Sequence, residues 1–136
     1  MLGSTSPYRR ELLSRLGLPF TTAMPNYAEA SASASGSGTE AARDLALENA
    51  RGKARSLAAD HPNALVLASD QVCECECIFF GKPGTSAAAR AQLALLAGKE
   101  HRLHTAVVIL DTSSGRIEEA VVTSPLRMRP LTEVEI

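Results

Sequence analysis

The chain has 136 residues, of which 45% are hydrophobic and 21% are charged, as in an ordinary globular domain. Its net charge is -1, from 14 basic and 15 acidic residues, so no overall positive field favours non-specific nucleic-acid binding. No apolar run approaches the ~18 residues that a membrane span requires. These properties predict a single domain over residues 1–136, with neither a nucleic-acid nor a membrane partner.

The first residues and the cysteines bear on the compartment. The stretch MLGSTSPYRR lacks the basic-then-apolar order of a secretory signal. Three cysteines are an odd number, which argues against a secreted disulfide framework. We therefore expect a cytoplasmic protein with reduced thiols.

The N-terminal segment predicts a turn that leads into a helix. Ser6 can cap this helix, Pro7 suits its first position, and Gly17 is a natural stop. A short strand is expected within 18–25. The Ser/Ala/Gly-rich stretch 26–38 has no helical or strand period, which indicates a mobile loop.

The middle of the chain predicts two further helices and a buried strand. Thr39 is expected to cap a long helix that runs to about Ala59. The apolar run 63–69 predicts a buried strand that ends at Asp70. Thr85 is expected to cap another helix, which stops at Gly98.

Two strands around a Ser-Ser-Gly turn are expected over 101–131. Strands that alternate with helices predict an α/β fold with a mixed, twisted sheet flanked by helices. Ligands in such sheets usually bind beyond the carboxyl ends of strands. Thr132 and Glu135 have capping-box spacing, which normally opens a helix, yet the chain stops one residue later. This pattern suggests a truncated chain; a frayed tail is the alternative.

The stretch GSTSPYRR combines hydroxyl groups with a helix N-terminus, a combination that favours anions. Arg9 and Arg10 lie in the first helical turn, where the helix dipole disfavours cations. A bound polyanion would resolve that conflict. The alternative is two solvated arginines on an ordinary capped helix.

Four other polar residues are candidates for chemistry. Asp70 ends an apolar strand and could bind a divalent cation or act as a general base; alternatively it caps a turn. Lys82 lies in a stiff loop before a helix and could hold a phosphate oxygen, or could be an exposed loop lysine. Lys53 lies near the apolar face of its helix and could reach a ligand or merely snorkel. Glu29 could share a metal with Asp70 or simply be solvated.

The stretch VCECECI raises the question of a metal cluster. As a strand it places the three cysteines, Cys73, Cys75 and Cys77, on one face and the two glutamates on the other. A closed zinc site needs four converging ligands, which three collinear cysteines do not supply. We expect the thiols to pack against the core and Glu74 and Glu76 to face water. A metal-sensing or redox-sensing protein is the alternative.

Four motifs occur together in the order and approximate spacing of one family: GSTSPYRRELLSRLGLPF, GKARSLA, ASDQVC and FGKPGTSAAARAQLALLAGK. On these motifs the sequence resembles the Maf-type nucleoside triphosphate pyrophosphatases, most closely the branch that acts on 7-methyl-GTP, and the resemblance covers nearly the whole chain. The resemblance implies a Maf/inosine-triphosphatase-like fold. It also implies hydrolysis of the α–β phosphoanhydride to a nucleoside monophosphate and pyrophosphate, with Mg²⁺ or Mn²⁺ as cofactor. A homodimer is suggested on the same basis.

The resemblance also implies roles for individual residues. Asp70 would be the proton acceptor that activates water and would help to hold the metal, with Glu29 as a second acid. Gln71 and Tyr8 match positions associated with base preference. Polar positions that line the triphosphate site are matched by Ser4, Arg9, Arg10, Lys53 and Lys82.

The sequence departs from the family pattern at several positions. Ala28 and Gly52 each replace an acidic residue, and ECECIFF replaces an Asp-Gly-type hairpin and offers no comparable tight turn. The family's final third is absent, and the Thr132 capping box falls where it should begin. Two interpretations follow: an active pyrophosphatase, or a catalytically impaired nucleotide-binding remnant of the same fold.

Overall fold

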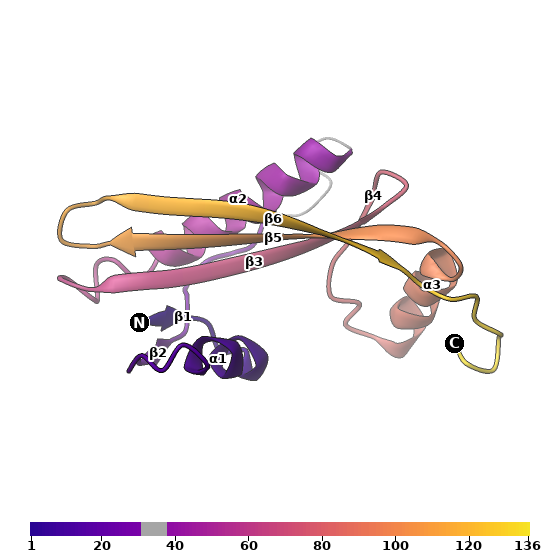
Figure 1. Ribbon diagram of the computed structural model, residues 1–136, viewed down its shortest axis with the longest axis horizontal. Helices are drawn as coiled ribbons and strands as arrows, with labels where there is room; N and C mark the ends of the chain where they lie inside the picture. The colour runs from indigo at the N-terminus through magenta and orange to yellow at the C-terminus, as the bar shows by residue number, and fades with distance from the viewer. Residues whose placement is uncertain (31–37) are drawn as a thin grey trace.

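A computed structural model describes residues 1–30 and 38–136 of the chain. Its sheet has six strands in the order β2-β1-β3-β5-β6, with β4 paired to β3 off this path (Figure 1). The strands are β1 (Leu2–Gly3), β2 (Thr22–Ala23), β3 (Leu65–Cys75), β4 (Ile78–Phe80), β5 (Glu100–Asp111) and β6 (Ile117–Arg127). The helices are α1 (Pro7–Ser14), α2 (Thr39–Arg55) and α3 (Ser86–Leu96).

The sheet is mixed, as the sequence predicts. Strand β1 is parallel to β2 and to β3, whereas β3, β5 and β6 form antiparallel pairs. These three long strands run the length of the molecule, with α1, β1 and β2 near one end and α3 near the other (Figure 1). The predicted α/β fold with a mixed sheet is therefore confirmed.

Helix α2 covers one face of the long strands and forms the core with them. Alternate residues of β3 and β5 point to this face, so their apolar side chains meet the apolar stripe of α2. The buried cluster consists of Ala42, Leu45, Ala46, Ala50, Ala54, Leu57, Val66, Ala68, Val72, Ala106, Val108 and Leu110. Full burial of a leucine or valine side chain of this cluster stabilises the fold by about 1.5–3 kcal/mol, so α2 is the main stabilising partner of the sheet.

The opposite face of the long strands is more open. Leu65, Ile109 and Val122 are exposed large hydrophobic residues on β3, β5 and β6. Helices α1 and α3 contain no fully buried residue. In the part of the chain that the structure describes, no helix is both long and apolar enough to cross a membrane.

The predicted helix starts are correct at two of three positions. Ser6 and Thr85 each accept a hydrogen bond from a backbone N–H of the first turn, and Pro7 is the first residue of α1. The prediction for Thr39 is wrong, because Gly38 precedes the helix and Thr39 is its first residue. Helix α2 also ends at Arg55, before the predicted boundary, and continues only as a turn.

The predicted end of the central strand at Asp70 is wrong. Strand β3 continues to Cys75, because β5 pairs with it residue by residue from Leu65 to Glu74. This ladder outweighs the polar character of the sequence beyond Asp70. The catalytic candidate therefore lies in the middle of a long strand.

The prediction that ECECIFF offers no tight turn is also wrong. Glu76 and Cys77 both have positive φ, 51° and 65°, and connect the paired residues Cys75 and Ile78 as a two-residue hairpin loop. Left-handed backbone costs about 1–2 kcal/mol for each non-glycine residue. The β3–β4 ladder and an ion pair of 2.7 Å between Glu76 and Lys99 offset this cost.

Burial in the hairpin differs from the expected alternation of inward thiols and outward glutamates. Cys77 is exposed because it lies in the turn, and Cys73 is only half-buried. Glu74 is buried, with 3% of its surface exposed, because it shares the α2 face with Asp70. The prediction is right for Cys75, which is buried, and for Glu76, which is exposed, and it is wrong for Glu74 and Cys77.

A polar network accounts for the burial of Glu74. Its carboxylate accepts a hydrogen bond of 3.0 Å from the Thr39 hydroxyl and lies 3.0 Å from His104 Nε2. His104 is completely buried, and its Nδ1 lies 2.9 Å from the Thr123 hydroxyl. Because an ionised carboxylate only accepts hydrogen bonds, Nε2 carries a proton and donates it to Glu74. Arg43 donates to the Thr123 hydroxyl oxygen. The network ties the start of α2 to β3, β5 and β6.

Strand β3 has a gap along one edge. Since Cys73 pairs with both Phe80 and Leu103, β4 and β5 occupy opposite edges of β3. Strand β1 pairs with β3 only at Leu67, on the same edge as β4. Residues 69–72 therefore have no strand partner on this edge among the described residues. The gap opens beside Asp70.

The C-terminal elements follow the predicted pattern. Strands β5 and β6 are joined by the predicted turn, where Gly115 has φ 75°. Hydrogen bonds from Ser113 and Ser114 lower the pKa of Asp111, at the end of β5, to about 2. Glu135 accepts hydrogen bonds from the backbone N–H and the hydroxyl of Thr132, which is one half of the predicted capping box. The loop expected over 26–38 lies mostly outside the described residues.

Titration of Glu74 is expected to appear in the stability of the protein. Burial raises the pKa of this carboxyl, but hydrogen bonds from His104 and Thr39 outweigh burial and hold the pKa below its ordinary value of 4.5. A depressed pKa stabilises the fold above pH 4.5, and this contribution is lost as the pH falls through the folded-state value. Glu74→Gln should lower the free energy of unfolding at pH 7 by about 1–3 kcal/mol.

This difference should shrink as the pH is lowered to about 3. Urea denaturation over this pH range measures it, with Glu133→Gln at an exposed glutamate as the control. A difference between Glu74→Gln and the parent protein that does not change with pH would contradict the network.

A glycine in the β3–β4 turn is expected to stabilise the protein. Cys77→Gly removes the Cβ at a positive φ and so relieves backbone strain in the folded state. Glycine also raises the conformational entropy of the unfolded chain, which opposes this effect. The net increase in the free energy of unfolding should be about 0.5–1 kcal/mol. Thermal denaturation should show a higher melting temperature than for Cys77→Ala, which keeps the Cβ. An equal or lower melting temperature for the glycine variant would show that the turn is not strained.

Candidate active site

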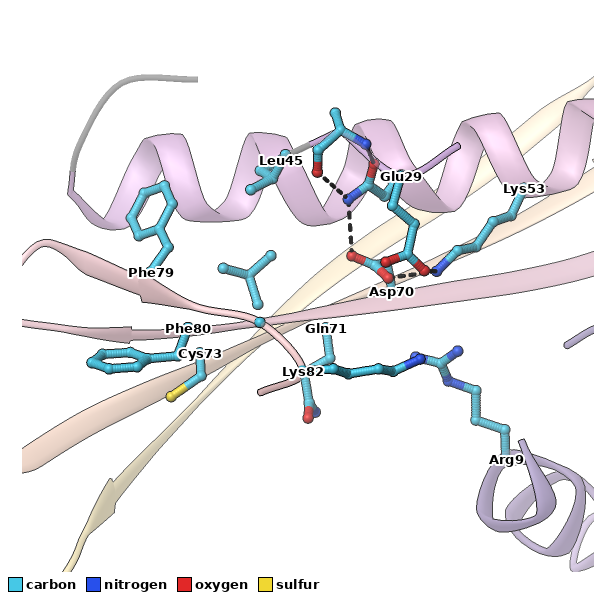
Figure 2. Close-up of a pocket in the computed structure, with 14 residues that line it drawn as sticks. Arg9, Glu29, Leu45, Lys53, Asp70, Gln71, Cys73, Phe79, Phe80 and Lys82 are labelled. Atoms are coloured by element: carbon cyan, nitrogen blue, oxygen red, sulfur yellow. Dashed lines mark hydrogen bonds and ion pairs between the residues drawn. The ribbon is translucent and has the colours of Figure 1, made fainter. Parts of the chain in front are cut away.

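A cavity of about 620 Å³ lies at the gap in the edge of β3 (Figure 2). Helices α1 and α2, strands β3 and β4, the residues after β4 and residues 29–30 all contribute to its wall. The lining residues are Arg9, Glu29, Ala30, Leu45, Asn49, Lys53, Asp70, Gln71, Val72, Cys73, Phe79, Phe80, Gly81 and Lys82. One half of this wall is charged and the other is apolar and aromatic.

An ammonium group between two carboxylates forms the polar half. Lys53 Nζ lies 2.6 Å from Asp70 Oδ1 and 2.7 Å from Glu29 Oε1. Lys53 and Asp70 are both buried, whereas about half of the Glu29 side chain is exposed. Figure 2 shows the three side chains converging beneath α2. A buried ammonium group needs such partners, because its desolvation costs several kcal/mol.

Asn49 holds the other side of this cluster. Its side-chain N–H donates to Asp70 Oδ2 at 3.3 Å, and its Oδ1 accepts from the backbone N–H of Ala30 at 2.8 Å. Asn49 and Lys53 are one helical turn apart on α2, so both reach Asp70 from the same face. Both carboxylate oxygens of Asp70 are thus positioned by α2.

The surrounding cations act on Glu29. The hydrogen bond from Lys53 lowers the pKa of this carboxyl, burial opposes the shift, and the positive charges of Lys82 and Arg9 lower it further. Glu29 is therefore ionised at neutral pH and available to a cation.

Arg9 and Lys82 approach the gap from different elements. Arg9 reaches in from α1 and Lys82 from the loop after β4, and their charged ends point toward one another (Figure 2). Like charges in this arrangement repel unless an anion lies between them. Both residues also line a smaller cavity of about 220 Å³ with Ser4, Ser6 and other residues at the start of α1. The arrangement suits a polyanion.

A third cavity, of about 630 Å³, lies on the open face of the sheet and is lined mainly by apolar residues. Tyr8, Leu12 and Leu16 of α1 form part of its wall. Gln71 lines this cavity as well as the first, and its side-chain N–H donates to the Thr105 hydroxyl at 2.7 Å. Since consecutive strand residues face opposite sides, Asp70 and Gln71 serve different faces at the same gap.

The structure brings most of the predicted site residues to this gap. Those that line its cavities are Ser4, Tyr8, Arg9, Glu29, Lys53, Asp70, Gln71 and Lys82. Arg10 is not among them, because it lines a separate surface depression with Pro7 and Phe20. Adjacent helical residues point in different directions, so only one arginine of the pair can reach the gap.

Two functional candidates were not identified from the sequence. The available signal for Asn49 is its position as a polar residue among the buried apolar residues of α2, one turn before Lys53. Thr105 carried no local signal, because its contact with Gln71 depends on the β3–β5 register.

Asp70 and Glu29 are the acidic residues at the gap that could hold a divalent cation. Among the described residues, no group of three or more His, Cys, Asp or Glu side chains is arranged to hold a metal. Asp70 and Glu29 do converge on one positive charge, that of Lys53. Mg²⁺ is commonly bound by one or two carboxylates together with substrate phosphates. The donor set therefore fits a cation that shares its ligands with a phosphate chain.

Removal of the Lys53 charge is expected to destabilise the protein. Lys53→Met leaves Asp70 buried without its cation and should lower the free energy of unfolding by about 3–5 kcal/mol. The double variant Lys53→Met/Asp70→Asn should recover part of this loss, as measured by urea denaturation at pH 7. Arg116→Met, which removes an exposed ion pair with Glu118, is the control and should change stability little. Equal losses in the single and double variants would contradict the coupling.

The comparisons with known proteins place the whole chain in one family. A family model described as Maf-like protein matches residues 1–136. A 7-methyl-GTP pyrophosphatase from Cupriavidus metallidurans is 42% identical over 136 residues, which cover 100% of this chain and 66% of that protein. The 7-methyl-GTP pyrophosphatase of Neisseria meningitidis is 39% identical over the same length and is covered to 67%. The chain spans about two thirds of the length of these curated relatives. It belongs to the Maf-like protein family.

Proposed function

We propose that the chain carries the catalytic site of a nucleotide pyrophosphatase that hydrolyses the α–β phosphoanhydride of 7-methyl-GTP or a related nucleotide. The observation that carries this proposal is the convergence of Asp70, Lys53 and Glu29 beside two facing cations at the gap. Relatives at 39–42% identity named 7-methyl-GTP pyrophosphatase support the choice of substrate.

The reaction consumes one water molecule. The α–β P–O bond breaks, water supplies the oxygen that completes the products, and its proton passes to Asp70 and then to solvent. Asp70 is suited to this role because its carboxylate is held in place by Lys53 and Asn49 and borders the cavity. The products are a nucleoside monophosphate and pyrophosphate.

Cationic side chains are expected to stabilise the charge that develops on the leaving pyrophosphate. Arg9 and Lys82 border all three cavities at the gap, so a triphosphate chain between them would offset their mutual repulsion. Lys53 would neutralise the phosphate next to Asp70. Catalysis of this kind relies on positioning and electrostatics.

The nucleoside is expected on the open face of the sheet. The cavity there is mainly apolar and contains one amide, that of Gln71, which can hydrogen-bond a base edge. A 7-methylguanine base is cationic, and an aromatic ring such as that of Tyr8 attracts a cation over its face. The gap in β3 would then let the phosphate chain pass from this face to Asp70.

A divalent cation such as Mg²⁺ or Mn²⁺ would be held by Asp70 and Glu29 together with the phosphates. When bound, it would neutralise phosphate charge and polarise the scissile anhydride. A cytoplasmic location and a homodimer stay predictions.

A catalytically impaired nucleotide-binding protein of the same fold is the second candidate. Ala28 and Gly52, which replace acidic residues of the family pattern, favour it because they reduce the negative charge available to a metal. It predicts that nucleotides raise the melting temperature without being hydrolysed.

The catalytic role of Asp70 is tested by pyrophosphate release. With Mg²⁺ present, 7-methyl-GTP should be hydrolysed faster than dTTP, UTP or GTP, and Asp70→Asn should lower the rate by about 10²-fold or more. Glu133→Gln at an exposed position serves as the control. No release from folded protein, or release that persists in Asp70→Asn, would defeat the proposal.

A further inference from the structure

The segment Tyr27–Ala30, which we call the strap, lies across α2 next to the candidate active site. Its last residue is fixed by Asn49, which bonds both the N–H and the C=O of Ala30, at 2.8 and 3.3 Å. Its Glu29 side chain is held by Lys53 at 2.7 Å. Glu29 is otherwise half-exposed, so its position depends on how the strap lies on the helix.

A third contact fixes the other end of the strap. The Tyr27 ring lies directly over the backbone of α2 at Gly52, where a Cβ would come within 2.1 Å of the ring. Any other residue at position 52 would therefore displace the ring. Asn49, Gly52 and Lys53 have i, i+3, i+4 spacing, so all three contacts lie on one face of α2.

The Tyr27 ring also borders the smaller cavity, of about 220 Å³, beside the candidate active site. It lines the small cavity that contains Ser4, Arg9 and Lys82, and it lines a surface depression that contains Arg51 and Arg55. The ring thus separates the smaller cavity from Arg51 and Arg55 on the outer side of α2.

We propose that Tyr27 is a positioning residue, whose ring rests on Gly52 and thereby holds the Glu29 carboxylate on Lys53 beside Asp70. The missing side chain at position 52 is then a requirement of this contact, because it makes room for the ring. The role of Glu29 in turnover rests on the proposed function, whereas the positioning itself does not. The competing explanation is that Tyr27 only fills a groove on α2.

Titration of Glu29 tests the positioning without any need for turnover. NMR of the side-chain carboxyl carbons reports each glutamate separately, and Glu29→Gln assigns the signal. The pKa of Glu29 is low because Lys53 donates to it, so it should rise toward 4.5 in Tyr27→Ala and in Gly52→Ala. Tyr27→Phe keeps the ring and should keep the pKa low.

Glu119 is the matched internal control. Its pKa is lowered by Arg51, the residue of α2 next to Gly52, on a different partner strand. It should stay low in every variant. An unchanged Glu29 in Tyr27→Ala would overturn the proposal, and so would a parallel rise of Glu119, which would indicate general damage to α2.

Pyrophosphate release from 7-methyl-GTP provides the second readout. Tyr27→Ala and Glu29→Gln should each lower the rate by the same factor, on the order of 10-fold to 100-fold, and the double variant should lose no more. Additive losses would overturn the proposal. If the unmodified chain releases no pyrophosphate, the proposed function fails, and the carboxyl titration alone decides the role of Tyr27.

Discussion

The buried ammonium group of Lys53 is the constraint on which the rest of the site depends. An ammonium ion inside a protein must be paired, because its desolvation outweighs any single contact that it makes. Lys53 is paired on both sides, by Asp70 from the central strand and by Glu29 from the strap. This requirement fixes the distance between α2 and β3 and holds an otherwise irregular segment against the helix.

Strand β3 contributes to the packed core through one face and borders the open site through one edge. On the α2 face its apolar residues close the core, and Asp70 interrupts them where Lys53 is available as a charged partner. On the edge of β3 opposite β5, β1 pairs at Leu67 and β4 pairs from Cys73 onward. The unpaired stretch between these two strands leaves room for a ligand. The strained hairpin at Glu76 and Cys77 directs β4 back along β3, so that the loop after β4 brings Lys82 to the gap.

Local patterns in the sequence predicted the elements and most of the site. Caps at Ser6 and Thr85 are determined by neighbouring residues, and a helical period placed Lys53 on the covered face of α2. The motif resemblance correctly placed Asp70, Lys82 and Arg9 near one another. These features depend on residues close in sequence or on recognised motifs.

The features that could not be predicted depend on contacts between distant segments. The extension of β3 past Asp70 depends on pairing with β5, and the burial of Glu74 depends on His104 from that same strand. The turn at Glu76 is stabilised by a lysine 23 positions away. No local pattern shows that α2 covers the face of Glu74, so this glutamate was wrongly expected to face water.

Phosphorus NMR of 7-methyl-GTP incubated with the protein and Mg²⁺ tests the central claim most directly, because it identifies every phosphorus-containing product. Cleavage at the α–β anhydride predicts one nucleoside monophosphate and one pyrophosphate for each molecule consumed, with no orthophosphate. Orthophosphate with a nucleoside diphosphate would show cleavage at the wrong bond. An unchanged spectrum from folded protein would show that the convergence of Asp70, Lys53 and Glu29 does not support hydrolysis.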